Sequence, residues 1–85
     1  MDSKSERLRD ACAQAVKTFQ KLHQPEFDDI ISKLEYCIGS YNYDKNPKGL
    51  VEFGFQSLEM LKEIRKKFPR KVPPAVITSL EDSLT

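Results

Sequence analysis

The sequence predicts an all-α fold, a small antiparallel helical bundle formed by one domain over residues 1–85. Apolar residues recur at three- and four-residue steps along most of the chain, as they do on one face of a helix. Prolines and short polar segments divide this pattern into three long blocks and one short block. We therefore expect three main helices, at about 3–23, 25–42 and 47–68, and a short C-terminal helix at about 74–84.

The first helix is expected to begin at Ser3, because Ser3 and Glu6 have the spacing of a capping box. Its apolar residues form a narrow stripe, which predicts packing in a single groove. The stripe consists of Leu8, Cys12, Ala15, Val16, Phe19 and Leu22. The helix should end at His23 and Gln24, since the residue before a proline avoids helical geometry while Pro25 suits the first turn of the next helix.

The second helix begins with acidic residues, Glu26, Asp28 and Asp29, which complement the positive end of its dipole. Its predicted core stripe is Phe27, Ile30, Ile31, Leu34, Ile38 and Tyr41. A polar turn follows, in which Asn46 is expected to cap the third helix and Pro47 to occupy its first position.

The third helix is predicted to be the element around which the others pack, because its apolar arc covers about half of its circumference. The arc consists of Leu50, Val51, Phe55, Leu58, Leu61, Ile64 and Phe68, and Phe53 and Met60 widen it. Gly39 and Gly54 lie at similar distances from the intervening turn, which predicts a close crossing of the second and third helices.

The fourth helix should open at Pro73-Pro74. A helix of about eleven residues is marginal by itself, so it must dock on the other three. The docking residues are expected to be Val76 or Ile77, with Leu80 and Leu84.

Composition favours a folded protein of the cytoplasm. Hydrophobic residues make up 39% of the chain and the net charge is only +1, which is unlike a disordered chain. We expect no membrane insertion, because no apolar run approaches the roughly 18 residues of a membrane span and no signal peptide is visible at the N-terminus. Two cysteines are too few for the disulfide framework of a small secreted domain.

The sequence offers no candidate catalytic residue, and we expect neither an enzyme nor a bound metal or cofactor. Two cysteines and one histidine cannot supply the four ligands of a structural zinc, and no nucleophile is paired with a base. Cys12 and Cys37 lie almost equally far from the Gln24–Pro25 turn, so a helical hairpin would bring them to the same height. They are interpreted as small buried apolar side chains.

Four apolar residues lie on the flank of a predicted stripe or outside the stripes: Phe53 and Met60 on the flank of the third helix, Tyr36 opposite the stripe of the second helix, and Tyr43 in the turn. Either they cover the third helix beneath the fourth, or they form an exposed patch for a partner protein or a second copy of the chain. The second interpretation predicts a non-enzymatic protein–protein interaction module, or a self-associating homodimer.

The strongest charge feature is a basic run at the end of the third helix and just beyond it. It comprises Lys62, Arg65, Lys66, Lys67, Arg70 and Lys71. The alternative function is therefore anion or nucleic-acid binding through this run. Nucleic acid is the less favoured ligand, because neither glycines nor interleaved aromatic residues accompany the charges, and cations also suit a helix C-terminus.

The layout, a short helical bundle of fewer than a hundred residues, is similar to that of small cytosolic immunity proteins, which protect bacteria from their own bacteriocins. This resemblance implies an immunity-type binding protein as a further alternative. It covers the architecture alone and assigns no residue a role.

Overall fold

The computed structural model describes residues 3–84 of the 85-residue chain, and side chains from residue 4. The elements are α1 (Ser3–Leu22), a 3₁₀ turn (Pro25–Phe27), α2 (Asp28–Asp44), α3 (Lys48–Lys67) and α4 (Pro74–Leu84). The predicted all-α class is confirmed, and α1, α3 and α4 begin and end within one residue of the predicted ranges. α2 begins three residues later and ends two residues later than predicted. The first three residues of the predicted second helix form the 3₁₀ turn, and α2 follows it directly at Asp28.

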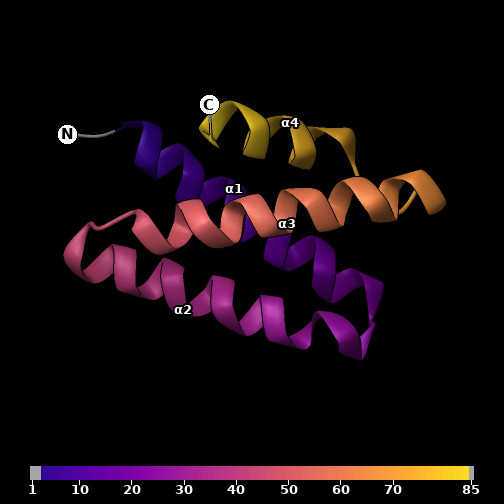
Figure 1. Ribbon diagram of the computed structural model, residues 1–85, viewed down its shortest axis with the longest axis horizontal. Helices are drawn as coiled ribbons and strands as arrows, with labels where there is room; N and C mark the ends of the chain where they lie inside the picture. The colour runs from indigo at the N-terminus through magenta and orange to yellow at the C-terminus, as the bar shows by residue number, and fades with distance from the viewer. Residues whose placement is uncertain (1–2, 85) are drawn as a thin grey trace.

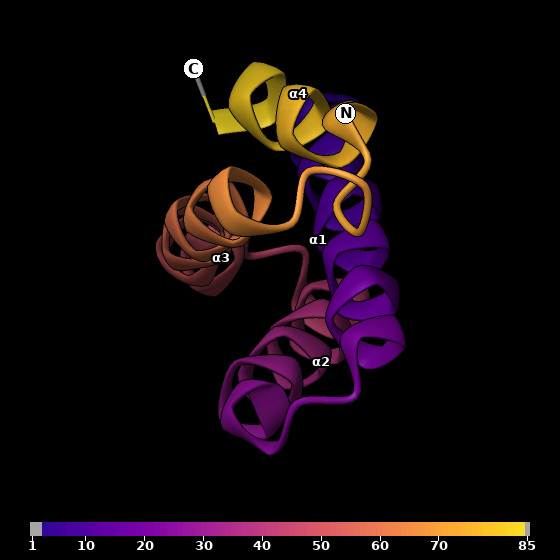
Figure 2. The ribbon, with the colours of Figure 1, turned by 90° about the vertical axis from the view of Figure 1, so that its right-hand side faces the viewer.

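α2 and α3 lie side by side and run in opposite directions, and α1 crosses behind them obliquely (Figure 1). α4 lies on α1 and α3, at the opposite side of the molecule from α2 (Figure 2). Both α1 and α3 pack against all three other helices. The prediction that α1 occupies a single groove is therefore wrong. Its buried face also includes Ser5, Ala11 and Thr18, small enough to let neighbours approach on both sides of the apolar stripe.

Local backbone geometry explains where the helices end. His23 and Lys45 adopt left-handed conformations, with φ of 55° and 61°, and these terminate α1 and α2. The Asn46 side chain accepts a hydrogen bond from the backbone N–H of Lys48 (3.1 Å), which stabilises the turn before α3. The predicted cap is nevertheless wrong by one residue, because Pro47 is the N-cap, Lys48 is the first helical residue, and no side chain caps the helix. α4 begins at Pro74, as expected for proline in a first helical turn. The capping box predicted at Ser3 involves a side chain outside the described residues.

The core receives side chains from every helix and from one connecting segment. The rings of Phe19 and Phe27 lie 5.1 Å apart and tie α1 to the 3₁₀ turn. Val76, Ile77 and Leu80 are buried, as predicted for the docking of α4. Val72, between α3 and α4, is also completely buried. This residue anchors the connection between α3 and α4 to the core.

The buried face of α3 is rotated relative to the predicted arc. Leu50, Leu58 and Leu61 are buried as expected, but Val51, Phe55 and Phe68 are 39%, 47% and 53% exposed. The small residues Gly54 and Ser57 are buried instead, and at Gly54 side chains of α1 and α4 approach the α3 backbone closely. The Ser57 hydroxyl donates to the Phe53 carbonyl oxygen (2.8 Å), so its burial leaves no unpaired polar group.

The predicted crossing at Gly39 and Gly54 is wrong. Gly39 is exposed and no atom lies within 4 Å of the position its Cβ would occupy. A Cβ on Gly54 would lie 3.4 Å from methyl carbons of Leu8 and Leu84, so this glycine faces α1 and α4. The glycine at the approach of α2 to α3 is Gly49, where a Cβ would come within 2.8 Å of the Cys37 Sγ. Spacing from the turn did not reveal which face each glycine occupies.

Gly54→Leu is expected to lower the free energy of unfolding by about 1–3 kcal/mol, because the added atoms would collide with Leu8 and Leu84. Gly39→Ala is the control, and it should raise that free energy by about 0.5–1 kcal/mol, since alanine favours a helix where there is open space. Urea denaturation of both variants checks the pair. Equal midpoints for Gly54→Leu and the wild type would contradict the packing at Gly54.

Candidate functional site

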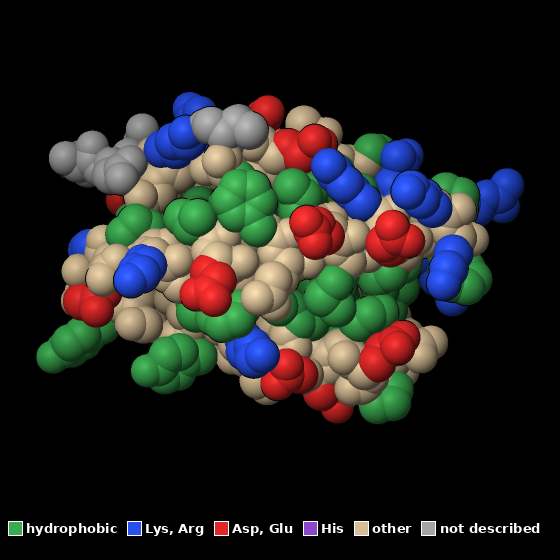
Figure 3. Space-filling view, in the orientation of Figure 1, with side chains coloured by type: hydrophobic (Ala, Val, Ile, Leu, Met, Phe, Trp, Pro, Cys, Tyr) green, Lys and Arg blue, Asp and Glu red, His purple; other side chains and the backbone are tan. Residues whose placement is uncertain are grey.

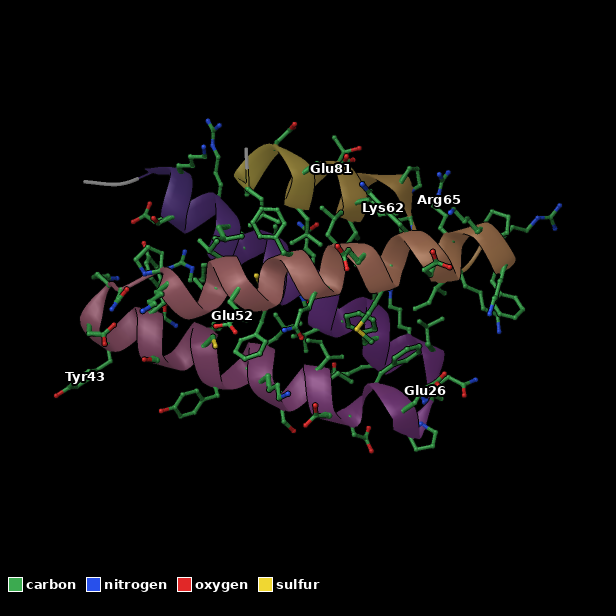
Figure 4. All side chains as sticks on the ribbon, viewed as in Figure 1. Glu26, Tyr43, Glu52, Lys62, Arg65 and Glu81 are labelled. Carbon is green, nitrogen blue, oxygen red and sulfur yellow. The ribbon has the colours of Figure 1, made fainter. Side chains whose placement is uncertain are left out.

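The structure distributes the four apolar residues of the predicted patch over two environments. Tyr36 and Tyr43, on α2, are 77% and 92% exposed, and Tyr43 points away from the molecule (Figure 4). Phe53 and Met60, on α3, are only partly exposed and pack against the core. The Lys33 Nζ lies 5.6 Å from the centre of the Phe53 ring, so Phe53 faces α2. The fourth helix therefore does not cover Tyr36 or Tyr43.

The basic run is also divided, because successive residues of a helix point in different directions. Lys62 forms an ion pair with Glu81 of α4 (3.4 Å), and these two lie with Arg65 toward α4 (Figure 4). Lys62, Arg65 and Lys66 line a shallow hollow beside Ile77. Lys67 and Lys71 instead line a larger hollow between the C-terminal half of α3 and the segment before α2, which comprises the end of α1 and the 3₁₀ turn.

This larger hollow has a volume of about 510 Å³. We call it the α2–α3 groove because it lies where these two helices diverge, although its lining residues come from α3, the residues after it, the end of α1 and the 3₁₀ turn. It opens because α2 and α3 diverge toward the end where α2 begins and α3 stops (Figures 1 and 2). Its apolar lining consists of Leu22, Phe27, Met60, Ile64 and Phe68. In Figure 3 this apolar surface lies between two sets of acidic side chains. The set above it belongs to α3, and the set below it lies on the opposite side of the groove.

Each wall of the α2–α3 groove follows from local structure. Met60 and Ile64 lie one turn apart on α3, and Phe68, the residue just after the helix, extends the apolar ridge that they form along the groove. The left-handed residue His23 turns the chain at the end of α1, and the 3₁₀ turn then brings Phe27 against Phe19. Leu22 and Phe27 thus form the base and the opposite wall of the groove.

Five charged residues also line the α2–α3 groove: Glu26, Glu59, Glu63, Lys67 and Lys71. All five are exposed, and Glu26 lies across the groove from the C-terminal half of α3 (Figure 4). An apolar base edged by charged groups is the usual composition of a protein-binding surface. It holds no arrangement that activates a nucleophile.

The sequence contains a signal for this groove that single apolar stripes do not reveal. Met60, Ile64 and Phe68 belong to the flank or arc of the predicted third helix, while Glu59 and Glu63 lie on its polar face. The two sets run in parallel at four-residue intervals. An apolar row beside a charged row indicates the edge of a buried face, but only the angle between α2 and α3 shows that this edge is open.

The two cysteines are free and buried, and both lie against the first half of α3. The Cys12 thiol is 4.0 Å from the Leu50 carbonyl oxygen, to which it donates. Burial, with a smaller contribution from the nearby Cys37 thiol, raises the pKa of Cys12 from 9.0 to about 12. Burial and then the charge of Glu52 also raise the pKa of Cys37. Thiols in this state are poor nucleophiles.

Stability should therefore decline in alkaline solution. Unfolded Cys12 loses its proton near pH 9.0 but folded Cys12 does so near 12, so the free energy of unfolding falls as the pH rises between these values. Cys12→Ala should be less sensitive to pH in this interval. Urea denaturation of both proteins from about pH 8 to about pH 11 tests this expectation, and parallel declines would contradict it.

Among the described residues, no group of three or more histidine, cysteine, aspartate or glutamate side chains is placed to hold a metal ion. None of the helices in the described part of the chain combines the length and apolar character required to cross a membrane. Comparisons with models of protein families, with curated proteins and with solved structures found no match. Among the described residues, the α2–α3 groove is therefore the feature that suggests a function.

Proposed function

We propose that this protein is a non-enzymatic protein-interaction module, and that its α2–α3 groove binds a helical segment of a partner protein. The observation that carries the proposal is the continuous apolar lining formed by Met60, Ile64 and Phe68 on one side and by Leu22 and Phe27 on the other. A monomer gains nothing from leaving such a surface in water, whereas a partner helix would bury it.

The shape of the groove favours a helix over a compact ligand. The ridge runs from Met60 on α3 to Phe68, the residue just after α3, and these positions are eight residues apart, or roughly 12 Å at about 1.5 Å per residue. A parallel segment of about ten residues would place apolar side chains one helical turn apart against this ridge, as in other helix-in-groove complexes. The acidic residues at the edge supply a chemical preference as well, since Glu26, Glu59 and Glu63 attract basic groups.

A peptide selection tests the proposal although the partner is unidentified. A display library of twelve-residue peptides is selected on the wild-type protein, with Phe68→Ser as the counter-selection target. Phe68 is half exposed, so its replacement should remove groove surface without unfolding the protein.

The proposal predicts that the enriched peptides share an apolar stripe with helical spacing and bind Phe68→Ser at least about tenfold more weakly than the wild type. Tyr36→Ser, which removes an exposed aromatic ring outside the groove, is the matched control and should bind normally. Peptides that depend on Tyr36 but not on Phe68 would instead assign the interaction to the outer face of α2. An absence of enriched peptides would contradict the proposed function.

A further inference from the structure

The charges along the α3 side of the α2–α3 groove change sign at a defined position. Glu59, Glu63, Lys67 and Lys71 all line the groove and follow one another at four-residue intervals. The first two are acidic and the last two basic. Lys71 lies beyond α3, but its Nζ is 5.6 Å from the centre of the Phe68 ring, which holds this cation at the end of the apolar ridge.

The neighbouring charges leave this polarity intact. Glu63 approaches Lys66 at 3.8 Å, but both side chains are largely exposed, and an exposed pair of this kind is weak. On the opposite wall the charged residue is Glu26, so that wall is acidic. A ligand in the groove therefore meets the Glu26 carboxylate on the opposite wall and the Glu59 and Glu63 carboxylates on the α3 side. It meets ammonium groups only where α3 ends.

We infer that the partner of the α2–α3 groove is an amphipathic helix whose flanks are basic in its N-terminal half and acidic at its C-terminal end, bound parallel to α3. This inference rests on the proposed function and deepens it. Basic side chains of such a helix would pair with Glu59, Glu63 and Glu26, and its terminal acidic residues with Lys67 and Lys71. The dipole of the bound partner helix favours the same orientation, because its positive N-terminus would lie beside Glu59 and its negative C-terminus beside Lys71.

The same charges disfavour the other ligands that an apolar groove could accept. A fatty acid or an anionic lipid would bring its negative charge among three carboxylates, and only the end near Lys67 and Lys71 would attract it. The phosphates of nucleic acid would meet the same opposition along the groove. A peptide helix can match both signs, because it presents separate side chains at successive turns.

The peptides selected on the wild-type protein provide the test, since their sequences report charge order separately from apolar spacing. The inference predicts enrichment of lysine and arginine in the first half and of aspartate and glutamate at the end. A protein with the rim charges exchanged, Glu59→Lys, Glu63→Lys, Lys67→Glu and Lys71→Glu, should bind the best peptide about tenfold more weakly than the wild type does. It should prefer the peptide with its charges exchanged in the same way. All four positions are exposed, so the fold should tolerate the exchange, which a thermal melt verifies.

The direction of binding is measured separately with a nitroxide spin label on the C-terminus of the peptide. The label should broaden the amide signals of residues 67–71 in the wild-type protein and leave those near Glu59 sharp. Broadening near Glu59 would overturn the parallel orientation. Peptides with an apolar stripe but no charge order would overturn the inference and leave the proposed function standing, whereas an absence of enriched peptides would overturn both. Stronger binding to vesicles of phosphatidylglycerol than to any peptide would also overturn it, in favour of a lipid ligand.

Discussion

Leu61→Ala is expected to lower the free energy of unfolding by about 2–5 kcal/mol, one of the largest losses that a single truncation in this protein should cause. Leu61 is completely buried at the centre of the α3 interface with the rest of the core. Its removal leaves a cavity that the helices on either side cannot fill without breaking their own packing. Urea denaturation monitored by circular dichroism measures the loss.

Phe55→Ala is the matched control on the same helix. It removes a larger side chain, yet Phe55 is nearly half exposed, so the loss should stay below about 1.5 kcal/mol. The periodicity of the sequence placed both residues in the core, and this pair of variants therefore distinguishes the observed rotation of α3 from the expected one. A greater loss for Phe55→Ala than for Leu61→Ala would contradict the observed rotation.

Ile64→Glu is expected to abolish peptide binding to the α2–α3 groove, with a loss of affinity on the order of a hundredfold or more. Ile64 is the middle residue of the apolar ridge, and a carboxylate there would be desolvated by any apolar side chain that enters the groove. Fluorescence anisotropy of a labelled peptide measures the affinity. Because Ile64 also contacts the core, its replacement carries a stability cost that has to be separated from the loss of binding.

Two comparisons separate these effects. Val51→Glu introduces the same charge on the same helix, at a partly exposed position outside the groove, and should bind the peptide normally. Ile64→Ala removes part of the ridge without adding charge and should bind about tenfold more weakly than the wild type. Equal affinity of Ile64→Glu and Val51→Glu would show that the ridge does not contribute to binding.

Helix positions followed from the sequence because their signals are local. Pro25, Pro47 and Pro74 lie where helical segments begin, and the core of α2 repeats at helical intervals. Each of these features depends on a few neighbouring residues, so the helix positions can be predicted from the sequence alone. The docking of α4 was equally predictable, since so short a helix is stable only when its apolar residues are buried against the other helices.

Contacts between helices were not predictable to the same degree. Gly54 leaves room for side chains of α1 and α4, so these helices pack on its face of α3. Phe55, which hydrophobic periodicity placed in the core, is consequently nearly half exposed. The α2–α3 groove depends on the angle between two helices, which no local pattern encodes. Hydrophobic periodicity therefore assigns some residues of the groove to the core and others to the polar surface. Only the folded structure shows that they line the same groove.

Whether the α2–α3 groove is a binding site is tested most directly by titrating the isotope-labelled protein with a selected peptide and following the amide chemical shifts. We expect the largest changes at Leu22, Phe27 and residues 59–71, and no effect at Tyr36 and Tyr43. Changes concentrated at Tyr36 and Tyr43, with none along the ridge from Met60 to Phe68, would contradict the assignment of binding to this groove.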